Sequence, residues 1–260
     1  MELANFSVEL LALLFLVAVL AGFLDTLAGG GGLISMPAII LSGVPPLAAL
    51  GTNKLQGSMG TATATYVMLK NKKITWDNVK FLMLTAFVGS VLGTITVQFI
   101  DATVLTFVIP IVLLLIAIYF LISPMVASSS AAKVKLSANK YQNAVIPVIG
   151  YYDGMFGPGT GSFFAMAGVS FRSHDLITST AIAKALNFAT NIASLIVFLI
   201  AGQLVWVIGL LMMLGQAIGA WLGSHFLFKI NPAYLRFVIV LMCTAMLIKY
   251  ADSVGWFGLS

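Results

Sequence analysis

The fold of this chain is decided by the stretch Gly22-Phe-Leu-Asp-Thr-Leu-Ala-Gly-Gly-Gly-Gly-Leu-Ile-Ser-Met-Pro37, which is followed by Gly51-Thr-Asn-Lys-Leu-Gln-Gly57. A fainter version returns as Gly150-Tyr-Tyr-Asp-Gly-Met-Phe-Gly-Pro-Gly-Thr-Gly-Ser162, followed by Thr180-Ala-Ile-Ala-Lys-Ala-Leu-Asn187. Each copy holds an Asp, a glycine-rich break, a short apolar run and a Lys, all within very hydrophobic sequence. Charges and interrupted helices are costly in lipid, so their recurrence indicates a functional site at membrane depth.

The composition around these stretches is that of a helical membrane protein. Hydrophobic residues make up 60% of the 260 residues and charged residues only 8%, with a mean hydropathy of +1.08. Soluble domains carry about 25% charged residues. Apolar runs such as Leu105–Ile122 approach the ~20 residues that a helical span needs. These runs lack the alternation of a β-barrel, so we predict an all-α polytopic membrane protein.

Several functions are disfavoured by the same sequence. The net charge of +5 does not indicate nucleic acid, because the basic residues cluster in loops between apolar runs. The N-terminus lacks the basic segment of a signal peptide, so we interpret the first apolar run as retained structure. Cys243 lies in an apolar run and is expected to be a small buried or lipid-facing residue. His174 and His225 have no metal-ligand spacing, so we expect no metal, no cofactor and no enzyme activity.

Each half of the chain is interpreted as one broken helix pair followed by three spans. In the first half we expect the pair, then the spans, at Glu9–Leu24 with Leu33–Leu41, then Leu47–Leu69, Trp76–Phe99 and Ala102–Leu121. In the second half the order repeats at Val145–Phe156 with Gly161–Val169, then Leu176–Ile200, Leu204–Phe228 and Tyr234–Ile248. A polar linker joins the halves, so the predicted boundaries are 1–123, 124–142 and 143–260.

The two halves match at a fixed offset, which indicates an internal duplication. Lys184 follows Lys54 at the same interval at which Trp206 follows Trp76, and only the interval from Asp25 to Asp153 is two residues shorter. Two glycine pairs share the fixed offset and predict close helix packing through small residues, Gly89 with Gly93 and Gly219 with Gly223. Because each half has three full spans, an odd number, the second copy must enter the membrane with the opposite orientation.

The Lys and Arg residues support this inversion. The loop around Lys70–Lys73 is basic, whereas its counterpart Gly202–Gln203 is uncharged. Arg172, conversely, matches an uncharged turn of the first half. The positive-inside rule then places ten of the 13 basic residues in the cytoplasm, namely Lys70, Lys72, Lys73, Lys80, Lys133, Lys135, Lys140, Arg172, Lys229 and Arg236. We therefore predict two inverted repeats with both termini in the periplasm.

Lys54 and Lys184 are the principal candidates for binding a ligand. A Lys at the bilayer centre costs ~2.5–3.5 kcal/mol, so each needs a partner, water or a ligand. We interpret them as cationic ligands for an anion; a snorkelling or salt-bridged structural Lys is the alternative. Each lies on a polar helix face, one formed by Lys54, Ser58, Thr61 and Thr65 and the other by Thr180, Lys184, Asn187 and Asn191. Several of these hydroxyls are expected to bond within their own helix instead.

The glycine breaks and the two Asp residues complete the candidate site. Backbone N–H groups at Gly30, Gly31, Gly159 and Thr160 could face a cavity, because helix N-termini bind oxyanions. The alternative role of these glycines is close helix packing. Asp25 and Asp153 are expected either to pair or cap, or to carry a coupling proton or cation.

The quoted stretches, together with Ala183-Lys-Ala-Leu-Asn187, closely resemble the TauE/SafE family of sulfite exporters and permeases, and within it the YfcA-like branch of bacterial inner-membrane transporters. The resemblance covers nearly the whole chain. It implies a secondary transporter of small anions, often sulfur oxyanions or organosulfonates such as sulfite.

We therefore expect alternating access around a midplane, Lys-lined site in a bacterial inner membrane, with a passive channel or a cation transporter as the alternative. The expected partners are a small anion, a proton or cation as candidate co-substrate, the lipid bilayer and a second copy in a homodimer, with no nucleic acid. The candidate substrate ligands are Lys54, Lys184, Asn53, Gln56, Asn187, Thr180, Gly30, Gly31, Gly159 and Thr160, and the candidate coupling or structural pair is Asp25 with Asp153.

Overall fold

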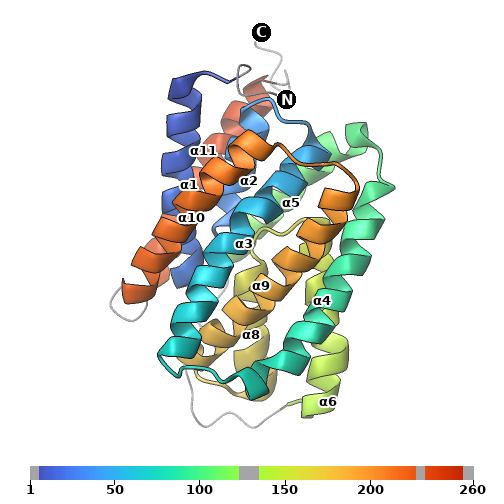
Figure 1. The fold of residues 1–260 in the computed structure, drawn as a ribbon, viewed down its shortest axis with the longest axis vertical. Helices are drawn as coiled ribbons and strands as arrows, with labels where there is room; N and C mark the ends of the chain where they lie inside the picture. Colours follow the sequence, from blue (N-terminus) through green and yellow to red (C-terminus); the bar gives the residue numbers. More distant parts are fainter. Residues whose placement is uncertain (1–5, 123–134, 227–231, 254–260) are drawn as a thin grey trace.

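The structure, a computed structural model, describes residues 6–122, 135–226 and 232–253, and every regular element in these ranges is helical (Figure 1). The elements of the first half are α1 (Val8–Ala28), α2 (Gly32–Leu41), α3 (Pro46–Lys70), α4 (Trp76–Gln98) and α5 (Ala102–Ile122). Those of the second half are α6 (Ala138–Lys140), the π-helical turn η2 (Tyr141–Val145), α7 (Ile146–Met155), α8 (Thr160–Arg172), α9 (Leu176–Ile200), α10 (Trp206–Phe226) and α11 (Pro232–Ser253). Most of the expected linker, with Lys133, and the loop with Lys229 lie outside the described residues.

The all-helical prediction is confirmed for the described chain, and five of its helices are long and apolar enough to cross a membrane: α1, α4, α5, α9 and α10. Three spans differ from expectation, and one of them is α11, which is not among the five although the sequence predicts a span at Tyr234–Ile248. α1 runs to Ala28, past the predicted end at Leu24, and at 21 residues can span by itself. α3 is 25 residues long but is not among the five, because Lys54, Gln56 and many small polar residues lower its hydropathy.

The ends of the broken helices follow from local backbone chemistry. α1 ends at Gly29, whose φ of 75° is left-handed and whose N–H donates to the Asp25 carbonyl oxygen. α8 begins after Gly159, which is left-handed as well, with φ 81°. α9 begins after the N-cap Asp175, whose carboxylate accepts the Thr178 backbone N–H at 2.9 Å. Hydrogen bonds from the Thr178 side chain and backbone lower the pKa of Asp175.

The helix starts of the two halves recur at the predicted offset. α3 and α9 begin at positions 46 and 176, α4 and α10 at 76 and 206, and α5 and α11 at 102 and 232, so one interval separates all three pairs. The starts of α2 and α8, at 32 and 160, are closer by two residues. The two-residue difference falls between the broken pair and the Lys-bearing helix, as the sequence indicates.

Each half packs its glycine-bearing helix, α4 or α10, against the helix that precedes the glycine break of the other half, α7 or α1. A Cβ atom on Gly93 of α4 would lie 2.0 Å from the Tyr151 carbonyl oxygen of α7. A Cβ atom on Gly219 of α10 would lie 1.9 Å from the Val19 carbonyl oxygen of α1. Only glycine permits such backbone contact, which confirms the close-packing prediction for these positions.

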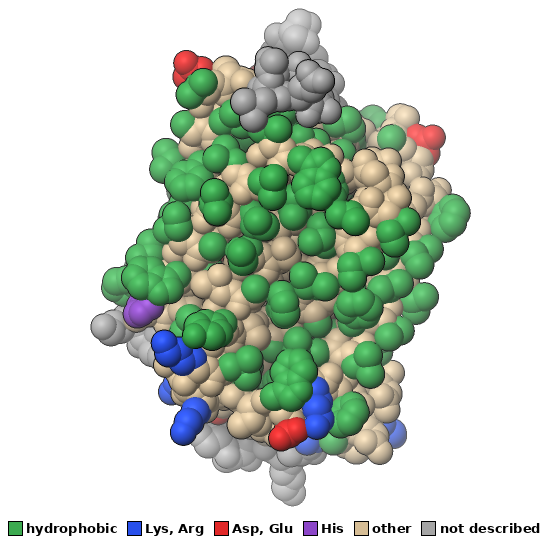
Figure 2. Space-filling model, in the orientation of Figure 1, with side chains coloured by type: hydrophobic (Ala, Val, Ile, Leu, Met, Phe, Trp, Pro, Cys, Tyr) green, Lys and Arg blue, Asp and Glu red, His purple; other side chains and the backbone are tan. Residues whose placement is uncertain are grey.

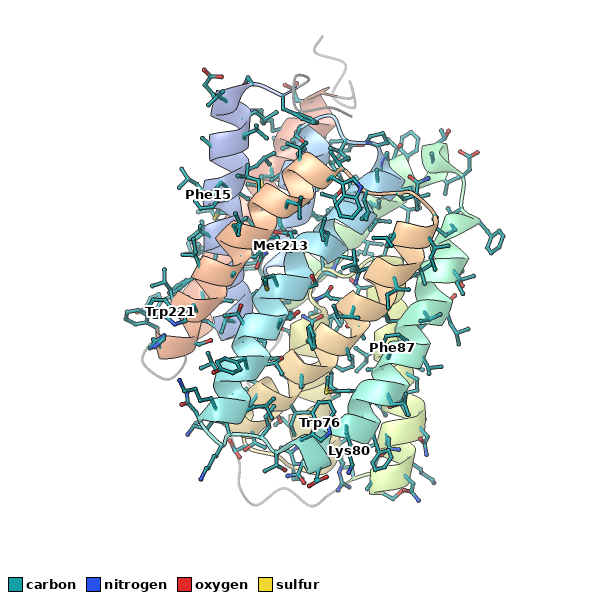
Figure 3. All side chains as sticks on the ribbon, viewed as in Figure 1. Phe15, Trp76, Lys80, Phe87, Met213 and Trp221 are labelled. Carbon is teal, nitrogen blue, oxygen red and sulfur yellow. The ribbon has the colours of Figure 1, made fainter. Side chains whose placement is uncertain are left out.

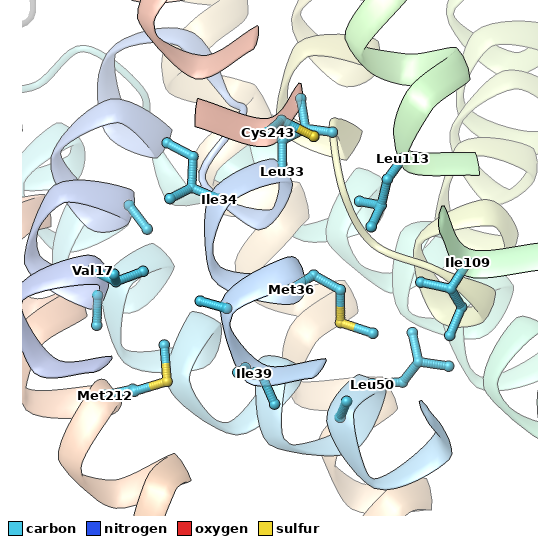
Figure 4. Packing of buried hydrophobic residues seen from close by; sticks show 14 of the residues in the cluster. Val17, Leu33, Ile34, Met36, Ile39, Leu50, Ile109, Leu113, Met212 and Cys243 are labelled. Atoms are coloured by element: carbon cyan, nitrogen blue, oxygen red, sulfur yellow. The ribbon is translucent and has the colours of Figure 1, made fainter. Parts of the chain in front are cut away.

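The apolar core surrounds the short helix α2, which contacts α1, α3, α5 and α11. Figure 4 shows Leu33, Ile34, Met36 and Ile39 of α2 enclosed by side chains from other helices, and all four are buried. Cys243 of α11 is buried in the same cluster, as expected of a small residue in an apolar run. α2 is thus held firmly beside the glycine break that precedes it.

The face of the molecule seen in Figure 2 has an apolar middle and a basic end. Figure 2 shows hydrophobic side chains over the middle of the molecule and the visible Lys and Arg side chains gathered near one end. Large aromatic side chains project outward, such as Trp76 and Trp221, which are more than half exposed (Figure 3). An outer surface of this kind suits a bilayer, with the aromatic residue Trp76 at a helix end.

Candidate functional site

The two glycine breaks contact one another directly in the interior of the bundle. A Cβ atom on Gly29 would lie 2.5 Å from the Ser162 backbone nitrogen, and one on Gly32 would lie 3.1 Å from Pro158 Cα. The Ser162 hydroxyl also donates to the Ala28 carbonyl oxygen. Segments from opposite halves of the sequence are therefore joined through their backbones, and this junction positions the candidate site.

Both buried lysines form ion pairs with an Asp of the other half. Lys54 Nζ lies 2.7 Å from Asp153 Oδ2, and Lys184 Nζ lies 3.1 Å from Asp25 Oδ2. Each lysine side chain is only 1% exposed. Each ammonium also donates to the backbone carbonyl oxygen of the Asp that it pairs with. Ion pairing is thus observed for Asp25 and Asp153, while a role in coupling stays a prediction.

This pairing explains why the helices tolerate an Asp in their last turns. The carboxylates of Asp25 and Asp153 lie close to the negative C-terminal ends of α1 and α7, where the helix dipole disfavours them. The lysine ammonium offsets both the carboxylate and the carbonyl group. Removing one member of a buried pair is strongly destabilising, because the other charge is left without compensation.

The two ion pairs differ in exposure. The Asp153 side chain is 2% exposed, whereas that of Asp25 is 17% exposed. Asp25 Oδ1 also accepts the Gly31 N–H at 3.1 Å, so the carboxylate is bound on both oxygens. Of the two carboxylates, Asp25 is the more accessible to a solute or water.

A polar cavity lies where the breaks meet α3, α9 and α10, with a free volume of about 40 Å³. One water needs roughly 10–15 Å³ by this measure, so the space suits a few waters or, after slight widening, a small ion. The cavity is lined by Asp25, Gly29, Gly32, Ser35, Asn53, Lys54, Gln56, Gly57, Thr61, Asp153, Gly157, Gly159, Thr160, Gly161, Asn187, Asn191 and Gln216.

Several polar groups on this lining make no hydrogen bond with the described residues. They are the fully buried Gln56 Oε1, the side-chain amides of Asn187 and Gln216, and the backbone N–H groups of Gly32 and Gly161, near the starts of α2 and α8. Leaving a buried polar group unpaired costs roughly 1–3 kcal/mol. Groups of this kind that surround one small space are therefore suited to a polar ligand.

Asn53 connects the polar lining of the cavity to the short helix α2 through a hydrogen bond with Ser35. Its Oδ1 accepts hydrogen bonds from Ser35 Oγ and from Gln56 Nε2, both at 2.7 Å. The amide oxygen of Asn53 is thus satisfied, while its amide nitrogen has no partner in the described chain. The arrangement leaves a nitrogen donor of Asn53 available for a solute.

The structure brings together most, but not all, of the sequence-predicted site. Lining the cavity are Lys54, Asn53, Gln56, Asn187, Gly159, Thr160, Asp25 and Asp153. Off the lining are Lys184, Thr180, Gly30 and Gly31. Lys184 is separated from the cavity by its pairing with Asp25, and the Gly31 N–H is occupied by the same carboxylate. Gly30 instead faces Ile239 and Phe120.

Thr180 lies in the second turn of α9, close to the N-terminal end of the helix, and is partly exposed. The polar stripes of α3 and α9 contribute Thr61 and Asn191, which face each other at 3.4 Å. As anticipated for such residues, the hydroxyls of Ser58 and Thr61 donate to carbonyl groups of their own helix.

Two residues on the cavity lining, Gln216 and Ser35, are not predicted from the sequence. Each is an isolated polar residue in an apolar helix, and that isolation is the sequence signal by which they could have been found.

The chain is similar to known transporters along nearly its whole length. The family model described as sulfite exporter TauE/SafE matches residues 14–250. A probable membrane transporter protein of Haemophilus influenzae is 38% identical, over 97% of this chain and 99% of the relative. The probable membrane transporter protein YfcA of Escherichia coli is 37% identical over 96% and 95%, and ORF9 of a Sinorhizobium species is 36% identical over 94% of each. No solved structure matches.

These findings confirm the resemblance stated above, including the YfcA-like branch. They also confirm the expectation that the protein is not an enzyme, because the family is one of transporters. The chain is a multi-pass membrane protein homologous to bacterial transporters, and it belongs to the TauE/SafE family of sulfite exporters.

Proposed function

We propose that the protein is a secondary transporter of a small anion, a sulfur oxyanion or organosulfonate such as sulfite, and that the anion binds in the cavity between the two glycine breaks. One observation carries the proposal: several nitrogen donors that make no hydrogen bond with the described residues belong to residues lining the same small polar space. They are the amide groups of Asn53 and Asn187 and the backbone N–H groups of Gly32 and Gly161. An oxyanion offers several acceptor oxygens that match such donors.

In this proposal the anion is held mainly by neutral donors. Each Lys charge is matched by an Asp charge, so the four ionisable groups of the two ion pairs have a formal sum of zero. Lys54 lines the cavity and adds a cation beside the ligand. Lys184 reaches the cavity only through Asp25 in this conformation, so we propose that it replaces Lys54 as the neighbouring cation when the site faces the other side.

The proposed mechanism is alternating access by two inverted repeats, residues 1–123 and 143–260, joined by the linker 124–142. Two features support it: the helix starts of the halves recur at a constant interval, and each Lys pairs with the Asp of the other half. Movement of one half relative to the other would change both ion pairs together. Asp25, the more exposed carboxylate, is our candidate for a coupling proton or cation.

We propose a bacterial inner-membrane location with both termini in the periplasm. In this proposal two basic segments lie in the cytoplasm. They are the turn after α3, with Lys70, Lys72 and Lys73, and the C-terminal end of α8, with Arg172. The gathering of Lys and Arg near one end of the visible face supports this orientation (Figure 2).

The test is binding followed by transport. Purified protein is titrated with sulfite, sulfate, thiosulfate, sulfoacetate, taurine, phosphate and chloride, with the melting temperature as readout, and the best ligand is then tested for uptake into proteoliposomes. We expect a rise in melting temperature with at least one sulfur oxyanion or sulfonate and uptake that saturates. Stabilisation by sodium or potassium alone, without dependence on the anion, would instead support the alternative of a cation transporter or channel.

A further inference from the structure

We propose that Gln216 determines which anion the site accepts, by donating hydrogen bonds from its side-chain amide to an oxygen of the bound oxyanion. This inference rests on the proposed function and adds a ligand from α10, a helix on which the sequence analysis identifies no site residue.

Gln216 is a buried polar side chain directed at the cavity. It lies in the middle of the apolar helix α10, is 4% exposed and lines the cavity. Its amide makes no hydrogen bond with any residue that the structure describes. A primary amide offers two donors and an acceptor, so leaving it buried and unpaired is costly unless a ligand or water meets it.

The chain provides a slot for this side chain by placing glycine at two positions. A Cβ atom on Gly60 of α3 would lie 2.7 Å from Gln216 Oε1, and one on Gly22 of α1 would lie 2.8 Å from the same oxygen. For Gly60, the three nearest atoms to such a Cβ all belong to Gln216. Any larger residue at position 60 would therefore displace the Gln216 side chain.

The slot also orients the amide. Its oxygen faces the two glycine backbones, where only weak C–H donors are available. The amide nitrogen, with its two N–H groups, is not among the atoms nearest to either glycine and is the donor offered to a solute. We infer that Gln216 offers donors, which suits the oxygens of a sulfite or sulfonate group.

Helix packing does not account for the residue. Its counterpart in the first half, at the interval that relates Trp76 to Trp206, is Ala86, whose carbonyl oxygen would lie 2.4 Å from a Cβ on Gly150. The Gln216 carbonyl oxygen would lie 2.5 Å from a Cβ on Gly22, in the equivalent contact. The same backbone contact is made with an alanine in the first half. The contact therefore does not require a glutamine, and we infer that the Gln216 amide serves binding.

The experiment compares Gln216→Leu and Gln216→Glu with the unaltered protein and with Gln98→Leu, a control on α4 whose glutamine does not line the cavity. Sodium sulfite, sodium sulfate, methanesulfonate and sodium chloride are the probes, with binding measured by calorimetry in detergent. We expect Gln216→Leu to weaken sulfite binding about tenfold or more, and Gln216→Glu to weaken it further, because a carboxylate repels the anion. Gln98→Leu should bind like the unaltered protein.

A second set of variants separates binding from folding. Gly60→Ala should lower the melting temperature and weaken sulfite binding, because the new methyl group displaces Gln216. In the double variant Gly60→Ala/Gln216→Ala the clash is absent, so the melting temperature should recover while binding stays weak.

The outcomes distinguish the two proposals. If the unaltered protein binds sulfite and all Gln216 variants bind it equally, the role of Gln216 is refuted and the anion site stands. If the unaltered protein binds neither these four anions nor the other ligands of the titration under Proposed function, the proposed anion site fails, and the inference fails with it.

Discussion

Lys54 and Asp153 lie 99 residues apart in the chain, yet Lys54 Nζ and Asp153 Oδ2 are 2.7 Å apart in the interior. The same ammonium also binds the Asp153 carbonyl oxygen. One lysine of α3 thereby neutralises both the carboxylate and the C-terminal end of α7. This contact joins the two halves of the protein beside the cavity, so its loss should affect binding and stability in ways that can be measured separately.

Lys54→Met should weaken anion binding and lower the stability of the protein. Loss of a charge-assisted contact is worth ~1.5–3 kcal/mol, which weakens anion affinity by roughly one to two orders of magnitude. Asp153 would be left unpaired, at a cost of ~3–5 kcal/mol in stability. The double variant Lys54→Met/Asp153→Asn should recover part of the melting temperature without recovering binding. Unchanged affinity in Lys54→Met, measured by calorimetry on folded protein, would mean that the lysine is structural only.

Lys184→Met provides the matched comparison. Because Asp25 is 17% exposed and also bound by the Gly31 N–H, its carboxylate is better compensated after the loss of the lysine. We expect a smaller fall in melting temperature than for Lys54→Met, together with loss of transport in proteoliposomes. A larger destabilisation than in Lys54→Met would contradict this ordering of the two pairs.

Asp25→Asn tests coupling. The substitution keeps the size of the side chain and removes its ability to carry a proton. Uptake should then lose its response to an imposed pH gradient, while anion binding at fixed pH is retained. Asp153→Asn serves as the comparison, because its carboxylate is nearly inaccessible. Full gradient response in both variants would assign Asp25 and Asp153 a structural role only.

Single cysteines in a Cys243→Ser background test the proposed orientation. Asn71 and Ala201 are exposed residues in turns at matching places of the two halves, and both have ordinary negative φ values. A membrane-impermeant thiol reagent applied to cells with a permeabilised outer membrane should label Ala201→Cys but not Asn71→Cys. Labelling of Asn71→Cys from outside would overturn the proposed topology.

The N-cap of α9 predicts a response to pH. Asp175→Ala should lower stability by ~1 kcal/mol, as measured by thermal unfolding at neutral pH. Because hydrogen bonds to Thr178 lower the pKa of Asp175, its stabilising effect is present above the unfolded-state pKa of ~3.9 and is lost as the pH falls through the lower, folded-state pKa. The difference between Asp175→Ala and the unaltered protein should therefore shrink in acid. A constant difference at all pH values would show that the cap acts without its charge.

The sequence predicts the helical class, the duplication and the centre of the site because each leaves a local signal. Lys54 and Lys184 stand out in apolar helices, and the glycine breaks stand out by composition. The crossed pairing cannot be derived in the same way, since it depends on which helices of opposite halves touch. For that reason the sequence predicts Lys184 on the cavity, whereas Asp25 separates it from that space.

Other differences have similarly physical causes. α1 passes Leu24 because Lys184 compensates Asp25, which sequence alone presents as a helix-ending charge. Gln216 escapes sequence reasoning because one polar residue in an apolar helix has no periodic partner. Its significance depends on Gly22 and Gly60, which come close to it only after folding.

The crossed ion pairs also constrain how the protein is made. When α3 first enters the membrane, the residue that will neutralise Lys54 has not yet been synthesised, since Asp153 lies 99 residues further along the chain. The nascent first half must therefore keep this lysine solvated, or hold α3 at the edge of the translocon, until α7 arrives. The charge of Lys54 is therefore compensated only once both halves have been made, and a polypeptide that ends before residue 153 lacks the carboxylate that pairs with it.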